Sequence, residues 1–585
     1  MHSTKVAAKR RVNLVAWPKG RCSVTQPPMV RFVMLCPLLL CACAQGDRER
    51  NANELSVLIS DPPESLDPRR GSSAVEMRVQ ELIFRGLVQV ADDLSVVEDL
   101  AESIVIDGAQ HLTITLKKNI NFHTCFDGTP GGSLKAEDVI YSYESLRDPR
   151  VQSRKQRILA DVDRFDSPDP KGREVRIHLR KPSAVWLGEN GTLGILEKAC
   201  AEKDPKAFAR APSGTGAFAF EAREADRRIW LKRFDPSVAY ERMELRVVGD
   251  ETSRLLELLK GRADVLTVTP SRPLLPPLKR RQELDLINAA GNGYSYLAFN
   301  LRLPELRDQR VRQAIASAID RQAIIEHKYL GLARPSAAMT PPDHWAHPKD
   351  LKPSAYNPRQ AAALLNAAGW RTNPELVSDP SANQKLPVLR LEMRTTPEKF
   401  GRALSLVLQD QLRQVGIDLQ LRINDWGTLY SQVKKGNFQL VRMEWIPVLS
   451  PALLDWVFHS YAQPQSAGSC QTAADCPGGA EPGEEASKER FSCSSGTCRR
   501  NGGNRGGYSN SKVDALLDAA SRETQKERQA ELYAKAQHIL SRDLPYVSLW
   551  HEDRVWIVRQ PWTGVELKPS GSFLGLLKAH REAAP

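Results

Sequence analysis

Residues 389–445 read LRLEMRTTPEKFGRALSLVLQDQLRQVGIDLQLRINDWGTLYSQVKKGNFQLVRMEW, and this stretch decides the fold. Apolar and polar residues alternate in three short segments, which is the period of a β-strand. Between them, two segments place apolar residues on one helical face and end at a glycine. The expected elements are strands at 389–393, 417–423 and 438–445, with helices at about 404–415 and 429–433. A β-α-β-α-β order predicts a parallel, doubly wound α/β core.

The carboxyl end of the third strand is the first candidate for a binding site. Ligands of open α/β sheets bind beyond the carboxyl ends of the strands, and Trp445 ends the strand expected at 438–445. We predict that Trp445 lines a ligand site; a tryptophan packed in the core is the alternative. Strand alternation places Glu444 on the opposite face from Trp445.

The first 43 residues are typical of an export signal. They carry seven basic residues and no acid, and their apolar run at 32–42 is too short to span a bilayer stably. The run ends in LCAC at 40–43, which resembles the lipobox of bacterial lipoproteins. We therefore predict a signal peptide over 1–43, lipid attachment at Cys43 and a tether over 44–53. A plain secretory signal is the alternative, and a start at Met29 would shorten the signal.

The net charge of +12 does not indicate a nucleic-acid partner. The chain has 82 basic and 70 acidic residues, and without the first 43 residues the basic surplus falls to five. We find no basic stripe interleaved with aromatic residues, the usual footprint of nucleic-acid binding.

Six cysteines follow Cys43, an even number that favours disulfides in an exported chain. Residues 464–507 are rich in small and charged residues, and we predict an exposed insertion there. Its four cysteines have the spacing C-x5-C-x16-C-x4-C, which suits disulfides better than zinc. The disulfide candidates, whose pairing stays open, are Cys125, Cys200, Cys470, Cys476, Cys493 and Cys498.

Catalytic motifs are not found. The chain has no H-E-x-x-H and no G-x-S-x-G elbow. His123, His459 and His551 are isolated from one another in sequence, and we interpret them as structural. We therefore expect no catalytic residue, no metal site and no cofactor.

Five segments resemble one known family, the peptide and nickel class of bacterial ABC-transporter substrate-binding proteins. In their order and spacing they match that family over nearly all of 54–570 apart from the insertion. The segments are SLDP at 65–68, IFRGLV at 83–88 with DLAES at 99–103, FH at 122–123 with AEDV at 136–139, GTGAF at 214–218, and FN at 299–300 with DQRVRQA at 308–314 and AIDR at 318–321.

The resemblance implies a two-lobed periplasmic-binding-protein fold, class II-like, joined by a hinge and closing over solute. Lobe I would take 54–295, including an extra subdomain at about 100–205, and the C-terminal return at 551–585. Lobe II would take 296–550 with the insertion at 464–507. The crossings between lobes would run through 294–300 and 550–558, so Tyr294, Tyr296 and Asn300 join Trp445 and Glu444 as candidate ligand-binding residues.

Several residues of these motifs have structural interpretations. We expect Gly214 and Gly216 to adopt backbone conformations that a side chain would forbid. No Lys-Ser/Thr follows them, so a phosphate loop is rejected. Arg310, Arg312 and Asp320 are expected to form ion pairs within lobe II.

The chain departs from the family at one position. Peptide-binding members carry W-x-x-D, whose aspartate meets the ligand's α-ammonium, but here the segment after Trp445 places Val448 there. A buried ammonium needs a charged partner, so free-N-terminal peptides should bind weakly. Glu444, Asp425 or Asp455 would have to supply the missing charge.

The resemblance implies an extracytoplasmic solute-binding lipoprotein of an ABC uptake transporter for peptides or peptide-like compounds. Its partners would be the ligand, an ABC permease and ATPase complex, and the membrane to which its lipid anchors it. It would work as a monomer in the periplasm or cell envelope. A surface receptor or sensor that keeps the fold without transport is the alternative, and an enzyme is the least favoured class.

Overall fold

The computed structural model describes residues 53–71, 73–446, 448–469, 492–494, 497–500 and 502–582. The signal over 1–43 and Cys43 therefore lie outside the described residues. Within the described part, none of the helices combines the length and apolar character that crossing a membrane requires.

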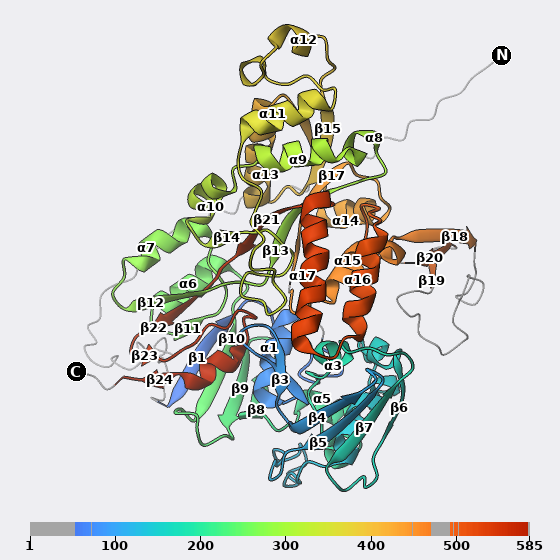
Figure 1. Cartoon of the computed structure of the whole chain (residues 1–585). Helices are drawn as coiled ribbons and strands as arrows, with labels where there is room; N and C mark the ends of the chain where they lie inside the picture. The colour runs from blue at the N-terminus through green and yellow to red at the C-terminus, as the bar shows by residue number, and fades with distance from the viewer. Residues whose placement is uncertain are drawn as a thin grey trace, which may run out of the picture. The chain divides into compact units, whose positions relative to one another are not determined.

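A seven-stranded sheet contains both the first strand of the described chain and a strand near its end (Figure 1). Its central strand β1 is parallel to β10 and β11, and the other pairs are antiparallel. β1 is buried along nearly all its length, because α1 (Ala74–Ile83) and α6 (Glu251–Leu259) supply apolar residues to two separate core clusters against it. In sheet order the strands are β12 (Leu284–Ala289), β22 (Arg554–Arg559), β11 (Val265–Leu266), β1 (Glu54–Ile59), β10 (Arg242–Val247), β9 (Arg228–Arg233) and β8 (Phe218–Glu224).

A four-stranded antiparallel sheet forms a separate core with α2 (Ala136–Glu144). Its order is β4 (Ala101–Asp107), β5 (His111–Leu116), β7 (Glu174–Leu179) and β6 (Val162–Asp166). Residues alternate between exposed and buried along β5, as a half-buried strand requires.

The quoted stretch forms half of a six-stranded sheet. β17 (Leu440–Trp445), β15 (Arg390–Thr395) and β16 (Asp418–Ile423) are parallel, and α13 (Lys399–Gln414) and α14 (Trp426–Lys434) connect them, which confirms the predicted β-α-β-α-β unit. The third strand is two residues shorter at its start than predicted. The sheet is mixed, because antiparallel strands extend it beyond β17: β13 (Tyr294–Phe299), β21 (Tyr546–Glu552) and β14 (Ala333–Pro335).

Two different cores cover the two faces of this sheet. α9 (Gln309–Ala318), α11 (Pro358–Ala367) and α13 pack on one face, where Leu297 and Trp550 are buried. α14, α16 (Ser511–Arg522) and α17 (Lys526–Asp543) pack on the other, where Tyr294 and Tyr296 are buried. Asp308 caps α9 and Asn357 caps α11.

The chain passes between the two large sheets twice. β12 ends at Ala289 and β13 begins at Tyr294, while β21 ends at Glu552 and β22 begins at Arg554. The crossing segments are therefore 290–293 and 553. The predicted first crossing at 294–300 is wrong, because Tyr294–Phe299 form strand β13 of the six-stranded sheet, and the second lies within the predicted 550–558. The lobe boundaries 54–295, 296–550 and 551–585 stay predictions.

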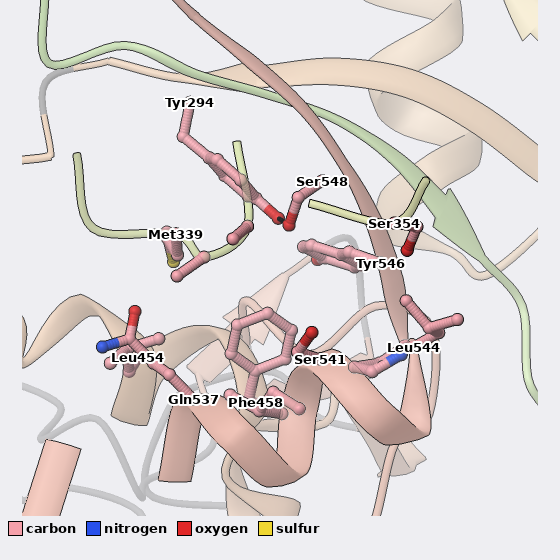
Figure 2. A pocket seen from close by; sticks show the side chains of 14 residues that line it. Tyr294, Met339, Ser354, Leu454, Phe458, Gln537, Ser541, Leu544, Tyr546 and Ser548 are labelled. Carbon is pink, nitrogen blue, oxygen red and sulfur yellow. Dashed lines mark hydrogen bonds between the residues drawn. The ribbon is translucent and has the colours of Figure 1, made fainter. Parts of the chain in front are cut away.

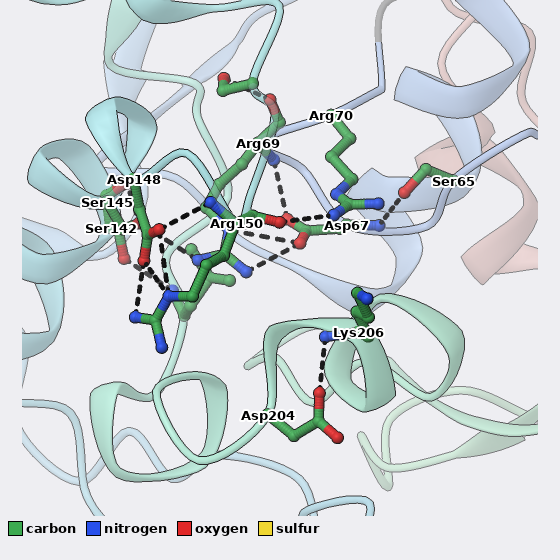
Figure 3. A network of polar contacts seen from close by, with 12 residues as sticks. Ser65, Asp67, Arg69, Arg70, Ser142, Ser145, Asp148, Arg150, Asp204 and Lys206 are labelled. Atoms are coloured by element: carbon green, nitrogen blue, oxygen red, sulfur yellow. Dashed lines mark hydrogen bonds and ion pairs between the residues drawn. The ribbon is translucent and has the colours of Figure 1, made fainter.

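The SLDP motif is a buried polar anchor (Figure 3). Asp67 and Arg69 are both fully buried and form an ion pair at 2.8 Å between Oδ2 and Nη2. Arg69 also donates to Ser145 Oγ at 3.2 Å, and Gln80 on α1 donates to the Asp67 carbonyl at 3.1 Å. The motif thus ties α1 to the end of α2.

Gly214 and Gly216 are needed for close packing, not for the backbone conformation that the sequence suggested. Their φ angles lie outside the left-handed region, but a Cβ on Gly214 would stand 2.2 Å from the Ile83 carbonyl oxygen. The buried His123 ring accepts from the Gly214 N–H at 3.3 Å and bonds the Gly216 carbonyl at 2.9 Å. Burial lowers the pKa of His123 to about 4, as expected of a neutral structural histidine.

The charged residues of the DQRVRQA motif are structural, although only one of them forms the expected ion pair. Arg310 pairs with Asp308 at 2.7 Å. Arg312 instead donates to main-chain carbonyls, including those of Leu306 and Asp543, and Asp320 caps α10 (Arg321–Tyr329). Orphan carbonyls at helix ends accept readily from a guanidinium, and they take the place of a carboxylate partner for Arg312 among the described residues.

Cys125 and Cys200 form a disulfide with a Cα–Cα distance of 5.8 Å, which confirms two of the candidates. In the predicted insertion, β18 (Gln465–Ser469), β20 (Thr497–Arg500) and β19 (Ser492–Ser494) form a small antiparallel sheet. Cys470 and Cys476, and the side chains of Cys493 and Cys498, lie outside the described residues.

The exposed insertion was predicted to extend to residue 507, and this is wrong at its end. Residues 502–506 are buried. Asn504 donates to the carbonyls of His459 and Tyr508, which ties this segment into the core.

Candidate functional site

Trp445 lies at the carboxyl end of β17, beside the first crossing. It is in register with Tyr294 on β13. Tyr296 stacks on Trp445 with ring centroids 6.5 Å apart and on Tyr546 at 4.3 Å. Tyr294 and Tyr296 are 2% and 1% exposed, so both tyrosines pack behind the tryptophan within the core.

Arg505 covers part of Trp445, a contact that sequence patterns do not predict. Its guanidinium lies 5.4 Å from the Trp445 ring centroid and 4.9 Å from that of Tyr430, a cation–π arrangement. It also donates to Tyr430 Oη at 3.1 Å. Arg505 was assigned to the exposed insertion, so its buried position was not expected.

A small cavity lies beside these aromatic residues, between α17 and strands β13 and β21 of the six-stranded sheet (Figure 2). Tyr294 and Ser548 share a hydrogen bond of 2.7 Å on one side, and Phe458 and Gln537 line the other. Its volume of about 30 Å³ has room for water and not for a peptide. This cavity is therefore too small to be the solute site.

Asn300 is not brought to Trp445. It follows the opposite end of β13, where Phe299 pairs with Leu440. Its amide donates to the carbonyls of Gly436 and Phe438 at 3.0 and 2.9 Å, which secures the turn between α14 and β17.

Val448 is buried in an apolar core cluster at 1% exposure. Its N–H donates to the Asn292 carbonyl at 2.9 Å, so the segment after β17 is joined to the first crossing. Of the acids that could replace a carboxylate there, Asp425 caps α14 by accepting from Thr428, and Asp455 accepts from the Tyr461 hydroxyl. Both carboxylates are already engaged.

Glu444, unlike Asp425 and Asp455, is not engaged by another described residue. It is half-buried, on the face opposite Trp445 as predicted, and its carboxylate occupies the space that Gly293 leaves: a Cβ there would meet Oε1 at 2.3 Å. Within the described residues it makes no hydrogen bond and no ion pair. Burial, and then the negative charge of Glu552, raise the pKa of Glu444 to about 7.

Charged residues from both large sheets surround Glu444. Arg272 precedes β12 and pairs with Glu552 at 3.2 Å. Arg554, at the second crossing, donates to the Asn292 side chain at 3.0 Å, and burial lowers its pKa to about 10. The charges of Arg272 and Arg554 both favour the ionised form of Glu444. These residues are far apart in sequence, so no local pattern could reveal the cluster.

Several buried polar atoms around this cluster have no hydrogen-bond partner among the described residues. They include Ser295 Oγ, which is in register with Glu444, as well as Asn292 Nδ2 and Arg442 Nε. Buried polar groups are rarely left unpaired, so this concentration indicates a site that receives water or a polar ligand. Over the described ranges, no group of three or more His, Cys, Asp or Glu residues is placed to hold a metal ion.

Residues that precede β12 and residues that follow β13 also contact each other away from the crossings. The Asp93 carbonyl, between β2 (Val88–Val90) and β3 (Val96–Glu98), accepts from the Trp345 N–H at 3.0 Å. The Asp93 carboxylate pairs with Lys526 at the start of α17 at 3.2 Å. Both pairing side chains are about half exposed, so this pair contributes little to stability.

Comparison with known proteins gives a consistent result. The family described as bacterial extracellular solute-binding proteins, family 5 Middle, matches residues 95–465. Heme-binding protein A of Haemophilus influenzae is 24% identical over 483 residues, covering 77% of this chain and 78% of that protein. Probable di/tripeptide-binding protein 5 of Pseudomonas aeruginosa is 24% identical over 566 residues, covering 92% and 97%.

Solved structures share the fold. HbpA2 from Haemophilus parasuis has a TM-score of 0.75 at 20% identity, with 91% of this chain and 100% of that chain covered. DppA from Helicobacter pylori, in complex with the peptide STSA, has a TM-score of 0.65 at 22% identity, with 91% and 98% covered.

Proposed function

Because this chain belongs to the bacterial extracellular solute-binding proteins of family 5, we propose that it captures peptides or peptide-like compounds for an ABC uptake transporter. Proteins of this family are transport receptors and not enzymes, and they act outside the cytoplasm. The observation that carries the proposal is the match to a di/tripeptide-binding relative over 97% of that relative's length.

The ligand would bind where the chain crosses between the two large sheets. The unpartnered polar atoms and the free Glu444 carboxylate at this place support that position. Movement of lobe I and lobe II about the crossings would enclose the ligand and then release it to a membrane permease. An enclosed ligand loses its water, so each of its charges needs a partner in the protein.

Glu444 is the acid that we assign to a cationic group of the ligand. Val448 is apolar and buried, and Asp425 and Asp455 are engaged elsewhere. The assignment replaces the carboxylate that peptide-binding members carry three residues after the tryptophan.

Lipid attachment at Cys43 would hold the receptor at the membrane. The proposal is supported by LCAC at 40–43 after an apolar run. Mass spectrometry should find diacylglycerol on this cysteine, and Cys43→Ala should release the protein from membranes. An unmodified, freely soluble mature protein would refute the anchoring.

The function is tested by identifying the ligand. Native mass spectrometry of protein purified from its own host should detect a bound peptide or peptide-like compound. Thermal-shift measurements with peptide pools should then show a rise in melting temperature, because a ligand that binds only the folded state stabilises it. Retention of a metal chelate or haem alone, with no response to any peptide pool, would contradict the peptide assignment.

A further inference from the structure

Six basic residues gather at the edge of the seven-stranded sheet where β1 begins. β11 and β12 begin at the same edge, because β11 is parallel to β1 and β22 runs antiparallel to both β11 and β12. α6 and α7 (Leu275–Lys279) precede these two strands, so both helices end at this edge, and their apolar residues share one core cluster on the same face of the sheet (Figure 1). The residues, which we call the basic edge, are Lys260, Arg262, Lys279, Arg280, Arg281 and Arg559.

Backbone contacts join the segments that carry these residues into one surface. The Gln560 N–H donates to the Glu283 carbonyl at 3.1 Å, just before β12. On the other side, the Arg559 N–H donates to the Asp264 carbonyl at 2.7 Å, and Arg559 Nη1 donates to the Leu258 carbonyl at 3.5 Å. The ends of α6 and β22 and the start of β12 are therefore direct neighbours.

Most of the positive charge of the basic edge is not neutralised. Arg262 pairs with Glu257 at 2.5 Å, and Arg281 pairs with Glu283 at 3.0 Å. Six bases against these two acids leave a surplus of four positive charges. Three of the remaining bases are exposed and make no side-chain hydrogen bond or ion pair within the described part of the chain: Lys260, Lys279 and Arg280.

Two other acids close to this edge do not offset the surplus. Glu54, the first residue of β1, pairs with Arg242 at 3.1 Å. Asp285 on β12 is exposed, but Leu284 and Leu286 pack with the helices, so strand alternation turns the Asp285 side chain to the other face of the sheet. The basic edge therefore presents a positive surface on the side where α6 and α7 end.

The same edge is where the chain enters the folded part. The tether predicted over 44–53 leads directly to Glu54 at the start of β1. A fully extended chain spans at most about 3.5 Å per residue, so a lipid on Cys43 would keep this edge within about 40 Å of the membrane surface. A short tether holds the edge near the lipid headgroups at a high effective concentration, so that a weak attraction is sufficient for contact.

We propose that the basic edge binds the anionic phospholipid headgroups of the membrane surface. The inference rests on the lipid anchoring in the proposed function and adds an electrostatic contact to it. Clustered Lys and Arg residues are attracted to anionic headgroups, each with about a fivefold gain in binding, and the attraction falls off within a Debye length of about 8 Å. A surplus of four charges gives reversible binding at millimolar lipid, which is too weak to hold the protein at the membrane without its lipid.

Binding through the basic edge would orient the proposed ligand site. β12 ends at the first crossing and β22 begins at the second, so the crossings lie at the opposite ends of these strands from the basic edge. A receptor bound at this edge directs the crossings away from the bilayer, toward the solutes that it captures. Because the attraction is reversible, the receptor can leave this position to meet the permease.

The test measures vesicle binding of the mature chain from Ala44, which carries no lipid, at millimolar lipid in a sedimentation assay. The vesicles contain either equal parts of phosphatidylglycerol and phosphatidylcholine or phosphatidylcholine alone. The edge variant combines Lys260→Gln, Lys279→Gln and Arg280→Gln. The control variant removes the same charge from exposed residues between α10 and α14, and combines Lys352→Gln, Lys385→Gln and Arg402→Gln. Melting temperatures establish that each protein folds.

The wild-type chain should bind the anionic vesicles at about 20 mM salt, should leave them at about 500 mM salt, and should not bind phosphatidylcholine alone. The edge variant should bind the anionic vesicles about thirtyfold more weakly or worse, because each lost cation removes about fivefold. The control variant has the same net charge as the edge variant and should stay within about threefold of wild type.

Equal losses in the two variants would overturn the inference, because net charge and not the basic edge would then govern binding. Wild-type protein that does not bind anionic vesicles at low salt would also overturn it, and diacylglycerol on Cys43 would in that case leave the proposed anchoring intact. Conversely, edge-dependent vesicle binding by a protein whose native Cys43 is unmodified would support the basic edge and refute the anchor. Vesicle binding that polyglutamate abolishes at equal charge concentration would reassign the edge to an acidic protein partner.

Discussion

Replacing Glu444 with glutamine should stabilise the protein at neutral and alkaline pH. In the folded chain this carboxylate is half-buried beside Glu552 and has no hydrogen-bond partner among the described residues, so its charged form is disfavoured. Glutamine has nearly the same shape and removes the charge. A residue kept in place for binding commonly costs stability in this way.

The direction and size follow from the pKa of Glu444, which rises from 4.5 to about 7 on folding. Between these two values the folded state binds more protons than the unfolded state, so the unfolding free energy of the wild type falls as pH rises through this window. A shift of that size corresponds to roughly 3 kcal/mol. The Glu444→Gln variant has no carboxyl group to titrate at this position, so its unfolding free energy does not fall in this way. Its advantage should therefore be absent near pH 4.5 and fully developed above pH 7.

Melting temperatures from pH 4.5 to 8 would measure the effect. With an unfolding entropy of about 2.1 cal/mol/K per residue, 3 kcal/mol corresponds to roughly 2 °C in a chain of this size. Glu326→Gln, on the exposed side of α10, is the matched control and should show no such trend. The reasoning is refuted if the difference between Glu444→Gln and wild type does not grow with pH, or if glutamine destabilises the protein at pH 8.

Three further outcomes are expected. Gly214→Ala should lower the unfolding free energy by about 2–4 kcal/mol, because its Cβ would collide with a backbone carbonyl; Gly188→Ala, inside α3 (Trp186–Asn190), should not, because a Cβ there would meet only Val96 Cγ2 at 3.9 Å, an ordinary contact distance. Cys200→Ala should cost about 4 kcal/mol by opening a loop of 75 residues, and a melting temperature equal to wild type would contradict this. Deleting 466–500 should leave the melting temperature nearly unchanged, since Gln465 and Arg500 are paired neighbours, whereas a deletion that continues into the buried residues after 501 should lower it.

The parts of the fold that local sequence patterns encode were predicted. The strands and helices of residues 389–445 follow from apolar periodicity, and Trp445 lies at a strand end as expected. The antiparallel half of the same sheet was not predicted, because β13 and β21 are joined to it only by pairing across long sequence separations. The burial of Arg505 was missed for a related reason. A composition typical of an exposed loop continues into residues that pack against Tyr430.

The site could be predicted only in part. Glu444 was identified because strand alternation fixes the face on which it lies, and Val448 because it replaces an expected acid. The neighbours of Glu444 could not be found in this way: Arg272, Glu552 and Arg554 are far apart in sequence, and only folding brings their charges near Glu444.

The charged residues at the crossings are of two kinds: some pair with each other, and Glu444 is available to a ligand. Arg272 and Glu552 form an ion pair at 3.2 Å, the arrangement expected of charges that join two parts of a fold. Glu444 lies within electrostatic range of these residues but makes no such contact in the described chain. If Glu444 were purely structural, Glu444→Gln would change stability and leave ligand binding unaffected. If Glu444 recognises the ligand, the same substitution must weaken binding while it raises the melting temperature of the empty protein.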